Sequence, residues 1–367
     1  MSSARRLAAL LIAVALSAGL LAACGSGSSS SASSSSKSAS SSSSSVTTVQ
    51  QVAATAGRPC HYRFAFISHG DNGSFWSIVY KGVRQAAADY GCTLTEVYGS
   101  QQQGQAEPDD NAENAQIQNA INQHVDGLII SDHDPTLMNP TMAKATADGI
   151  PVVTFNAGCD PADIAASHAI TCVGQPETVA GQAAGAQFAH LGKNNVLCVI
   201  HQSGQNLLDR CNGIAQALGV GQTCKTGSPP AHGPACTEIT LSTPNAASNP
   251  QQAIGQVTAY LQTHPQINAV MALNNAIGTA LVGTHPKAIV ATFDVNTEVA
   301  DDIANGSLAF AIDQQPYLQG YLPVVILYLY LTHHQSVAGG QILPTGPFVI
   351  DKGNVANLQK AIANGED

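Results

Sequence analysis

The stretch FISHGDNGSFWSIVYKGVRQAA, residues 66–87, joins the end of one secondary-structure element to the start of the next. It begins inside a short apolar run, residues 64–68, which a cluster of Gly, Asp and Asn closes. From residue 75 to residue 90, Ala and Val recur on one face at helical spacing. The stretch predicts a strand, a polar loop and a helix, and Trp76, the only tryptophan in 367 residues, lies where the loop meets the helix.

The same alternation of short apolar runs and helix-like segments continues along the chain. Such alternation is typical of parallel sheets flanked by helices. The folded part, from about residue 60 to residue 367, is long for one core, so the sequence predicts an α/β fold with two doubly wound parallel-sheet lobes. Strands are expected at 64–68, 93–98, 128–131, 150–155, 169–173, 195–201, 238–241, 268–273, 288–293 and 308–312, and helices at 75–90, 109–124, 139–148, 177–191, 206–218, 250–263 and 321–331.

The N-terminal segment has the pattern of an export signal. Arg5 and Arg6 precede an apolar run that ends in Leu-Ala-Ala-Cys, so residues 1–23 are expected to be a signal peptide. The last four residues resemble a bacterial lipobox, in which Cys24 is acylated and becomes the mature N-terminus. An ordinary secretory signal with a chance cysteine is the alternative. Residues 24–59, rich in serine, predict a flexible tether that holds a folded domain off a membrane surface.

Cysteine content and charge exclude several classes of function. Besides Cys24 there are eight cysteines, and an even number in an exported chain indicates disulfides. No pair has C-x-x-C spacing, which argues against zinc or thioredoxin-like chemistry. The formal net charge is -10 with only 14 Lys plus Arg, and no basic stripe suited to nucleic acid is present.

Polar residues follow nearly every expected strand. Ligands of doubly wound sheets bind beyond the carboxyl ends of the strands, so these residues are the candidates for a site. Amides and carboxylates bind hydroxyl groups, and an aromatic face packs on a sugar ring. Phosphate or carboxylate ligands would need Arg, Lys or a glycine-rich loop, so a neutral polyhydroxylated ligand and no cofactor are expected. The candidates are Asp71, Asn72, Phe75, Trp76, Asp132, His133, Asp134, Asn156, Gln202, Gln205, Asn206, Asn274, Asn275, Asp294, Asn296, Asp313, Gln314 and Gln315.

Some of these residues have simpler interpretations. Trp76 is alternatively just an aromatic residue at a helix start, and Asp294 is alternatively, or additionally, the N-cap of a helix after the strand at 288–293. The triplet Asp132-His133-Asp134 does not predict a metal site, because three adjacent residues of a strand cannot all face one ion.

Four stretches in a fixed order carry a resemblance to a known family: FISHGDNGSFWSIVYKGVRQAA, VDGLIISDHDP, GIPVVTFNAG and ATFDVNTEVADDIANGSLAFAIDQQPYLQGYLP. In these, from about residue 64 to residue 350, the chain resembles the ribose/galactose-type sugar-binding proteins of bacterial ABC importers, which are type I periplasmic binding proteins. The resemblance implies two lobes joined by a three-segment hinge. The N-terminal lobe would comprise residues 60–173 plus 315–343, and the C-terminal lobe residues 174–314 plus 344–367.

The resemblance also implies roles for individual residues. Phe75 and Trp76 match the family's ring-stacking aromatics by position, and several polar residues match its hydroxyl-binding groups. The chain departs from the family where Asn156-Ala157 replaces a common Asp-Arg, and where Arg210 lies two residues beyond the position of another common arginine. The expected ligand-binding residues are Asn72, Phe75, Trp76, Asp132, Asn156, Arg210, Asn274, Asp294 and Gln314. The expected disulfides are Cys60–Cys92, Cys159–Cys172, Cys198–Cys211 and Cys224–Cys236.

The resemblance implies a monomeric, lipid-anchored binding protein that is not an enzyme. It would capture a monosaccharide or similar neutral polyol and deliver it to an ABC import permease. A sugar-sensing receptor that presents its ligand to a membrane signalling protein has the same fold. An exported enzyme with Asp132 and Asp294 as acid and base is a further alternative, but no nucleophile, metal or phosphate motif supports it. A nucleoside or autoinducer is an alternative ligand.

Overall fold

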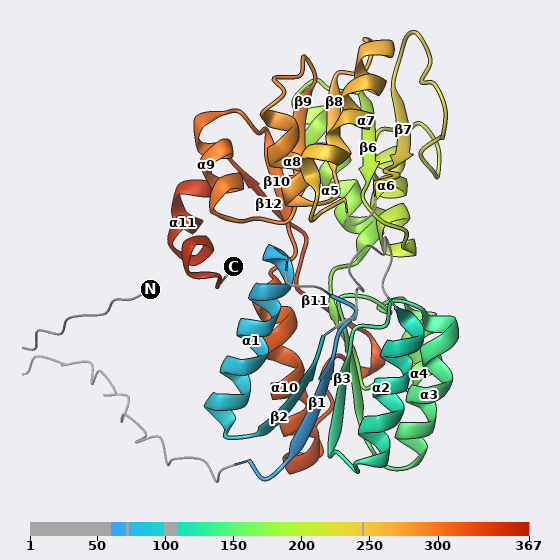
Figure 1. Cartoon of the computed structure of the whole chain (residues 1–367), viewed down its shortest axis with the longest axis vertical. Coiled ribbons are helices and arrows are strands. Elements are labelled where there is room, and N and C mark those ends of the chain that lie inside the picture. Colours follow the sequence, from blue (N-terminus) through green and yellow to red (C-terminus); the bar gives the residue numbers. More distant parts are fainter. Residues whose placement is uncertain (1–59, 71–72, 99–108, 244–245, 367) are drawn as a thin grey trace, which may run out of the picture. The chain divides into compact units, whose positions relative to one another are not determined.

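The computed structural model describes residues 60–70, 73–98, 109–243 and 246–366 (Figure 1). The expectations for the signal peptide, for Cys24, for the tether and for Asn72 concern residues outside these ranges. The described residues form two six-stranded sheets, both flanked by helices. The predicted α/β fold with two doubly wound lobes is therefore confirmed.

The first lobe contains a fully parallel sheet with the strand order β11-β5-β4-β3-β1-β2. Successive side chains of β1 (Arg63–Ile67) point to opposite faces. Phe64 and Phe66 pack on one face with residues of two helices, α1 and α10, whereas Ala65 and Ile67 pack on the other with residues of α2 and α3. The other elements are α1 (Ser74–Tyr90), β2 (Thr93–Val97), α2 (Asp110–Asn122), β3 (Gly127–Ile130), α3 (Pro135–Ala147), β4 (Val152–Phe155), α4 (Pro161–Ser167), β5 (Cys172–Gly174), α10 (Pro316–His333) and β11 (Ile342–Pro344).

The second lobe repeats this arrangement with the strand order β12-β10-β9-β8-β6-β7. Only the edge strand β12 runs antiparallel to its neighbour β10. Helices α5 and α6 pack on one face of the sheet, and α7 and α8 pack on the other. The elements are α5 (Glu177–His190), β6 (Asn195–Ile200), α6 (Gln205–Ala217), β7 (Ala235–Thr240), α7 (Pro250–Thr263), β8 (Ala269–Ala272), α8 (Asn275–Val282), β9 (Ile289–Phe293), α9 (Thr297–Asn305), β10 (Phe310–Asp313), β12 (Phe348–Asp351) and α11 (Val355–Asn364). The 3₁₀ turn Ala338–Gly340 lies between α10 and β11 of the first lobe.

The chain crosses between the two sheets after β5, after β10 and after β11. The three crossing segments contact one another closely. A Cβ atom at Gly346 would lie 2.8 Å from Oε1 of Gln175, on the first crossing, and 2.9 Å from the backbone oxygen of Asp313, beside the second. A side chain at residue 346 would therefore push these segments apart.

Several elements differ from the sequence-based expectation. The helix expected at 139–148 begins at Pro135, because Asp134 caps it by accepting the N–H groups of Thr136 and Leu137, and proline suits the first helical position. The helix expected at 321–331 is the buried helix α10, which begins five residues earlier. No helix within the described ranges is both long and apolar enough to cross a bilayer. The elements α4, α8, β11, β12 and α11 were not expected.

The alternative role of Asp294 as a helix N-cap is wrong. The N-cap of α9 is Asn296, whose Oδ1 accepts the backbone N–H of Val299 at 2.8 Å. Asp294 lies two residues earlier, in a left-handed backbone conformation with a φ of 66°. The carboxylate of Asp294 is therefore not used to cap α9.

All eight cysteines among the described residues form disulfides, and the four pairs are those that the resemblance implied: Cys60–Cys92, Cys159–Cys172, Cys198–Cys211 and Cys224–Cys236. The first joins the segment before β1 to the segment before β2. The third joins β6 to α6, across the loop between them. Each lobe therefore contains two covalent links inside its own core layers.

Candidate ligand-binding site

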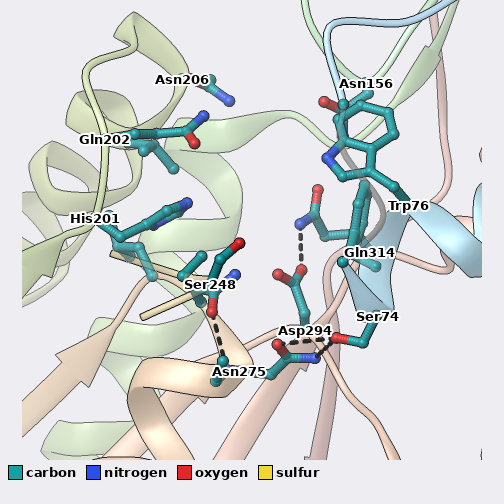
Figure 2. A pocket seen from close by; sticks show the side chains of 18 of the residues that line it. Ser74, Trp76, Asn156, His201, Gln202, Asn206, Ser248, Asn275, Asp294 and Gln314 are labelled. Carbon is teal, nitrogen blue, oxygen red and sulfur yellow. Dashed lines mark hydrogen bonds between the residues drawn. The ribbon is translucent and has the colours of Figure 1, made fainter. Parts of the chain in front are cut away.

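A pocket lies at the carboxyl ends of strands from both sheets (Figure 2). Its empty space measures about 790 Å³, solvent at the mouth included, which is within the range of small-molecule sites. The first lobe contributes His69, Gly70, Gly73, Ser74, Phe75, Trp76 and Asn156, and the second lobe and the crossing contribute His201, Gln202, Asn206, Leu207, Arg210, Ala247, Ser248, Leu273, Asn274, Asn275, Ala276, Asp294 and Gln314.

Most of the expected ligand-binding residues meet at this pocket. Phe75, Trp76, Asn156, Arg210, Asn274, Asp294 and Gln314 all line it. Sequence reasoning missed His69, Ser74, His201 and Ser248. The two histidines follow β1 and β6, so the strand-end rule would have found them, whereas Ser248 lies near the far end of the loop between β7 and α7, well beyond the end of the strand.

Asp132 does not line the pocket, and its expected ligand role is not supported by the geometry. The side chain is only 1% exposed and packs behind the loop after β4, where a Cβ at Gly158 would lie 2.6 Å from Asp132 Cβ. Both carboxylate oxygens are buried without a hydrogen-bond partner among the described residues. Burial, with the nearby charge of Asp163, raises the pKa of Asp132 to about 7.

The indole of Trp76 is held in place from several sides. Its ring lies so close to Gly70 that a Cβ there would overlap it. The His69 ring packs edge-on against the indole with centroids 4.8 Å apart, and Tyr80 stacks on it at 6.2 Å. His69 is fixed in turn, because its Nδ1 lies 2.8 Å from Oγ of Ser131. Burial, with the nearby His133, holds the pKa of His69 well below its usual value, so the ring is neutral.

Asn156 and Asp294 occupy equivalent places in the two lobes. Asn156 directly follows β4, and Asp294 directly follows β9. In each sheet, the neighbouring strand, β5 or β10, is the one after which the chain crosses to the other lobe. Both have left-handed backbones, with φ of 63° and 66°. Asn and Asp tolerate this conformation better than most residues, and such outliers cluster at functional sites. The two lobes thus present matching polar side chains to the same pocket.

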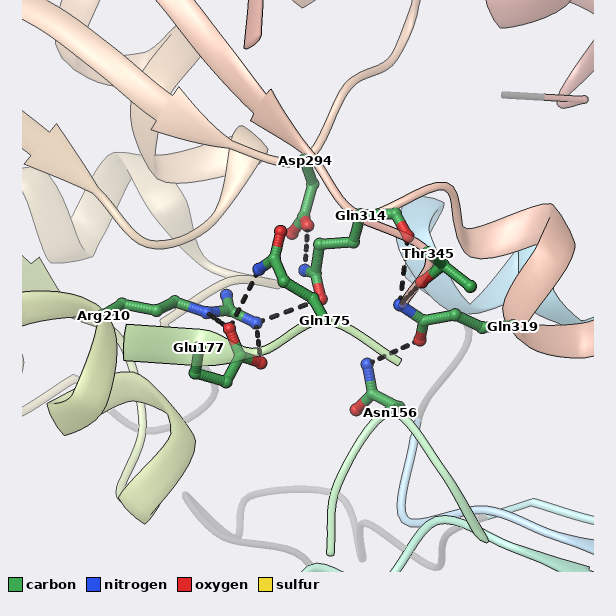
Figure 3. Close-up of polar contacts among 8 residues, drawn as sticks. All are labelled: Asn156, Gln175, Glu177, Arg210, Asp294, Gln314, Gln319 and Thr345. Carbon is green, nitrogen blue, oxygen red and sulfur yellow. Dashed lines mark hydrogen bonds and ion pairs between the residues drawn. The ribbon is translucent and has the colours of Figure 1, made fainter. Parts of the chain in front are cut away.

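A buried ion pair lies beside the pocket (Figure 3). Arg210, only 3% exposed, donates from Nε and Nη2 to the two carboxylate oxygens of Glu177 at 2.7 and 2.8 Å. Its guanidinium also lies 4.4 Å from the centroid of the Phe293 ring. Because Glu177 balances its charge, Arg210 does not make the pocket a site for anions.

The three crossing segments and the pocket share a hydrogen-bond network (Figure 3). Gln314, on the second crossing, donates to Asp294 at 2.5 Å and accepts from Arg210 at 3.1 Å. Asn156 donates to Gln319 at 3.1 Å, and Gln319 donates to the Gln314 backbone oxygen. Gln319 also donates to the hydroxyl of Thr345, on the third crossing. Gln175, on the first crossing, donates to Glu177, the partner of Arg210. Side chains that line the pocket in both lobes are therefore bonded, directly or through one residue, to all three crossings.

The two lobes also touch at the pocket. Asn275, 1% exposed at the start of α8, donates from Nδ2 to Oγ of Ser74 at the start of α1, at 2.9 Å (Figure 2). Burial raises the pKa of Asp294 to about 6, although Arg210 and Gln314 act in the opposite direction. No group of three or more His, Cys, Asp or Glu side chains able to hold a metal is found within the described ranges. The site offers amides, hydroxyls, one carboxylate and aromatic rings.

Comparisons with known proteins agree with this fold. A solved carbohydrate transporter from Acidothermus cellulolyticus, in complex with myo-inositol, is 35% identical with a TM-score of 0.72, and the match covers 84% of this chain and 100% of that one. A xylose/arabinose-binding protein of Sulfolobus acidocaldarius is 26% identical over 74% of this chain, and the match spans 66% of that protein's length. A ribose import binding protein of Bacillus subtilis is 25% identical over 68% of this chain and 75% of its own length.

A family model described as a periplasmic binding protein domain matches residues 64–335, which include most of both sheets and the pocket-lining residues Asn156, Asp294 and Gln314. Together with the two parallel-sheet lobes, this match settles the family. The chain belongs to the periplasmic binding proteins, and its fold is of type I.

Proposed function

We propose that this protein captures a neutral cyclic polyol, a monosaccharide or a cyclitol, in the pocket between its lobes. The observation that carries the proposal is the composition of the pocket: amides from both lobes and Asp294 surround it, Trp76 borders it, and its one cationic side chain is paired with Glu177. Hydroxyl groups match such a lining, whereas an anionic ligand would find no unpaired positive charge.

The named relatives support this ligand class. They include a xylose/arabinose-binding protein, a ribose import binding protein and a carbohydrate transporter in complex with myo-inositol. We include Asn72 among the ligand residues, since it lies four positions before Trp76 in the sequence. Because one chain forms the whole pocket, the functional unit is a monomer.

The protein acts outside the cytoplasm in this proposal. Acylated Cys24 anchors it to the membrane, residues 24–59 tether the folded part, and the closed, liganded form delivers the polyol to an ABC import permease. Ligand favours the closed form only through contacts that it makes with both lobes at once, so a permease that recognises closure also recognises occupancy.

Trp76 fluorescence tests the proposal directly. As the only tryptophan, it reports on the pocket even in the full-length chain, purified in mild detergent. The titration uses D-ribose, D-xylose, L-arabinose, D-glucose, D-galactose and myo-inositol, the last because of the 35% identical structure that contains it. A saturable change with micromolar midpoint for one of them supports the proposal. A flat signal for all six, with an unchanged melting temperature, refutes it.

A further inference from the structure

His201 lies in the wall that the second lobe contributes to the pocket. It directly follows β6, and its ring projects toward the cavity (Figure 2). Nδ1 of this ring is buried and has no hydrogen-bond partner among the described residues. Most buried polar atoms in native proteins have a hydrogen-bond partner. His201 is therefore a pocket-lining ring whose hydrogen-bonding capacity is not fully used within the described part of the chain.

The imidazole of His201 is neutral in this environment. Burial, with the positive charge of Arg210 nearby, lowers its pKa to about 3. A neutral imidazole has one N–H donor and one acceptor nitrogen, so it binds a hydroxyl without attracting anions. Arg210 itself is held by Glu177 and Gln314 and therefore stays in place to maintain this state.

The backbone that carries His201 is also fixed. Cys198, three residues earlier on β6, is bonded to Cys211 on α6, so the intervening loop is closed at both ends. Leu207, in the first turn of α6, is 2% exposed and anchors the far side of that loop in the core. The backbone that carries the His201 ring is therefore braced on both sides of the loop.

We propose that His201 is a specificity-determining residue: its imidazole binds one hydroxyl of the polyol, and the site selects ligands that carry a hydroxyl at that position. The proposal rests on the proposed function and deepens it. A site built to bind a hydroxyl rejects the analogue that lacks it, because the protein group then stays buried and unpaired.

The test combines variants with ligand analogues. The full-length wild type, His201→Leu and His201→Asn are titrated through Trp76 fluorescence with the six polyols named above and with analogues that each lack one hydroxyl. Leu removes both ring nitrogens at similar size, whereas the Asn amide can occupy the place of Nδ1. His190→Asn, at the exposed end of α5, is the matched control and should bind like the wild type.

We expect His201→Leu to bind the best polyol about tenfold more weakly, and His201→Asn to recover most of that loss. For one deoxy analogue, wild type and His201→Leu should bind equally, which identifies the hydroxyl. In the wild type, the ¹⁵N resonance of His201 Nδ1 should be that of a neutral ring and should shift on binding. Melting temperatures of the variants establish that each is folded.

The possible failures are distinguishable. Two results would refute the role of His201 while the proposed function stands. In the first, His201→Leu binds the polyol as tightly as the wild type does. In the second, the affinity of His201→Leu is lower than that of the wild type by the same factor for every analogue. If the wild type binds none of the six polyols, the proposed function fails and this inference fails with it.

Discussion

Arg210 and Glu177 form a two-pronged ion pair at the edge of the pocket, with both N–O distances below 3 Å and the guanidinium 3% exposed. The pair lets an arginine that lines the pocket donate a hydrogen bond to Gln314 while its charge is balanced by a carboxylate that does not line the pocket. A buried charge that loses its partner is strongly destabilising, which makes this pair testable.

Replacing Glu177 with Gln should lower the free energy of unfolding by about 3 kcal/mol, because the guanidinium charge is left buried without its carboxylate. The unpaired charge should also let the pocket accept an anionic sugar. Denaturant unfolding measures the first effect, and titration with D-galacturonate measures the second. Glu298→Gln, at an exposed position in α9, is the control and should change neither. Unchanged stability in Glu177→Gln would contradict the balancing role.

Replacing Gly70 with Ala should displace Trp76, because the new Cβ would overlap the indole. We expect a shifted tryptophan emission maximum in the free protein and a loss of polyol affinity of at least about tenfold. Gly255→Ala, in α7, is the matched control, since its Cβ would meet no atom within 4 Å. An emission spectrum and affinity like those of the wild type would show that the position of Trp76 does not depend on Gly70.

Replacing Asp132 with Asn should stabilise the protein at high pH. The pKa of Asp132 is about 7 in the folded protein against 3.8 for an unperturbed aspartate, so the folded state binds the proton more tightly. The free energy of unfolding of the wild type therefore falls as the pH rises from about 4 to 7. In the variant this decrease is absent, because asparagine does not ionise. At pH 8 the gain should reach at most about 4 kcal/mol, and at pH 3 it should vanish.

Thermal unfolding of Asp132→Asn across this pH range gives the comparison, with the exposed Asp301→Asn as the control. Because Asp132 lies outside the pocket lining, polyol affinity should stay within about twofold of the wild type. A large loss of affinity would restore Asp132 to the ligand-binding residues.

Replacing Cys24 with Ala should release the protein from the membrane. The lipobox interpretation requires the thiol as the acyl acceptor, so the variant expressed in a bacterium should lose incorporated radiolabelled palmitate. Fractionation should find the variant in the soluble extracytoplasmic fraction and the wild type in the membrane fraction. If both proteins fractionate alike, the N-terminal segment is an ordinary export signal or remains uncleaved.

The sequence predicted the larger elements because their patterns are local. The 3.6-residue spacing in α1 and the apolar run of β6 need no information from elsewhere in the chain. Short elements are less accessible: α4 has seven residues, and β11 and β12 have three and four and are defined by the strands that they pair with. Pairing with a strand that is distant in the sequence, as Ile342 of β11 pairs with Cys172 of β5, leaves no periodic signal.

The strand-end rule located the pocket but did not orient each side chain. It placed both Asp132 and Asn156 at the edge of the first sheet, yet only Asn156, with its left-handed backbone, lines the pocket. Asp132 is turned behind Gly158 by the course of the loop. Likewise, the pairing of Arg210 with Glu177 joins residues 33 positions apart, and no local pattern predicts it.

Two of the disulfides connect loops of the pocket to the sheets behind them. Cys159–Cys172 closes the segment that follows Asn156, and Cys198–Cys211 closes the segment that carries His201 and Asn206. Thiols stay reduced in most cytosols and become oxidised after export. The wall of the pocket therefore depends on the oxidation state of its surroundings: under reducing conditions, the segments that follow Asn156 and carry His201 lose their covalent links to β5 and α6.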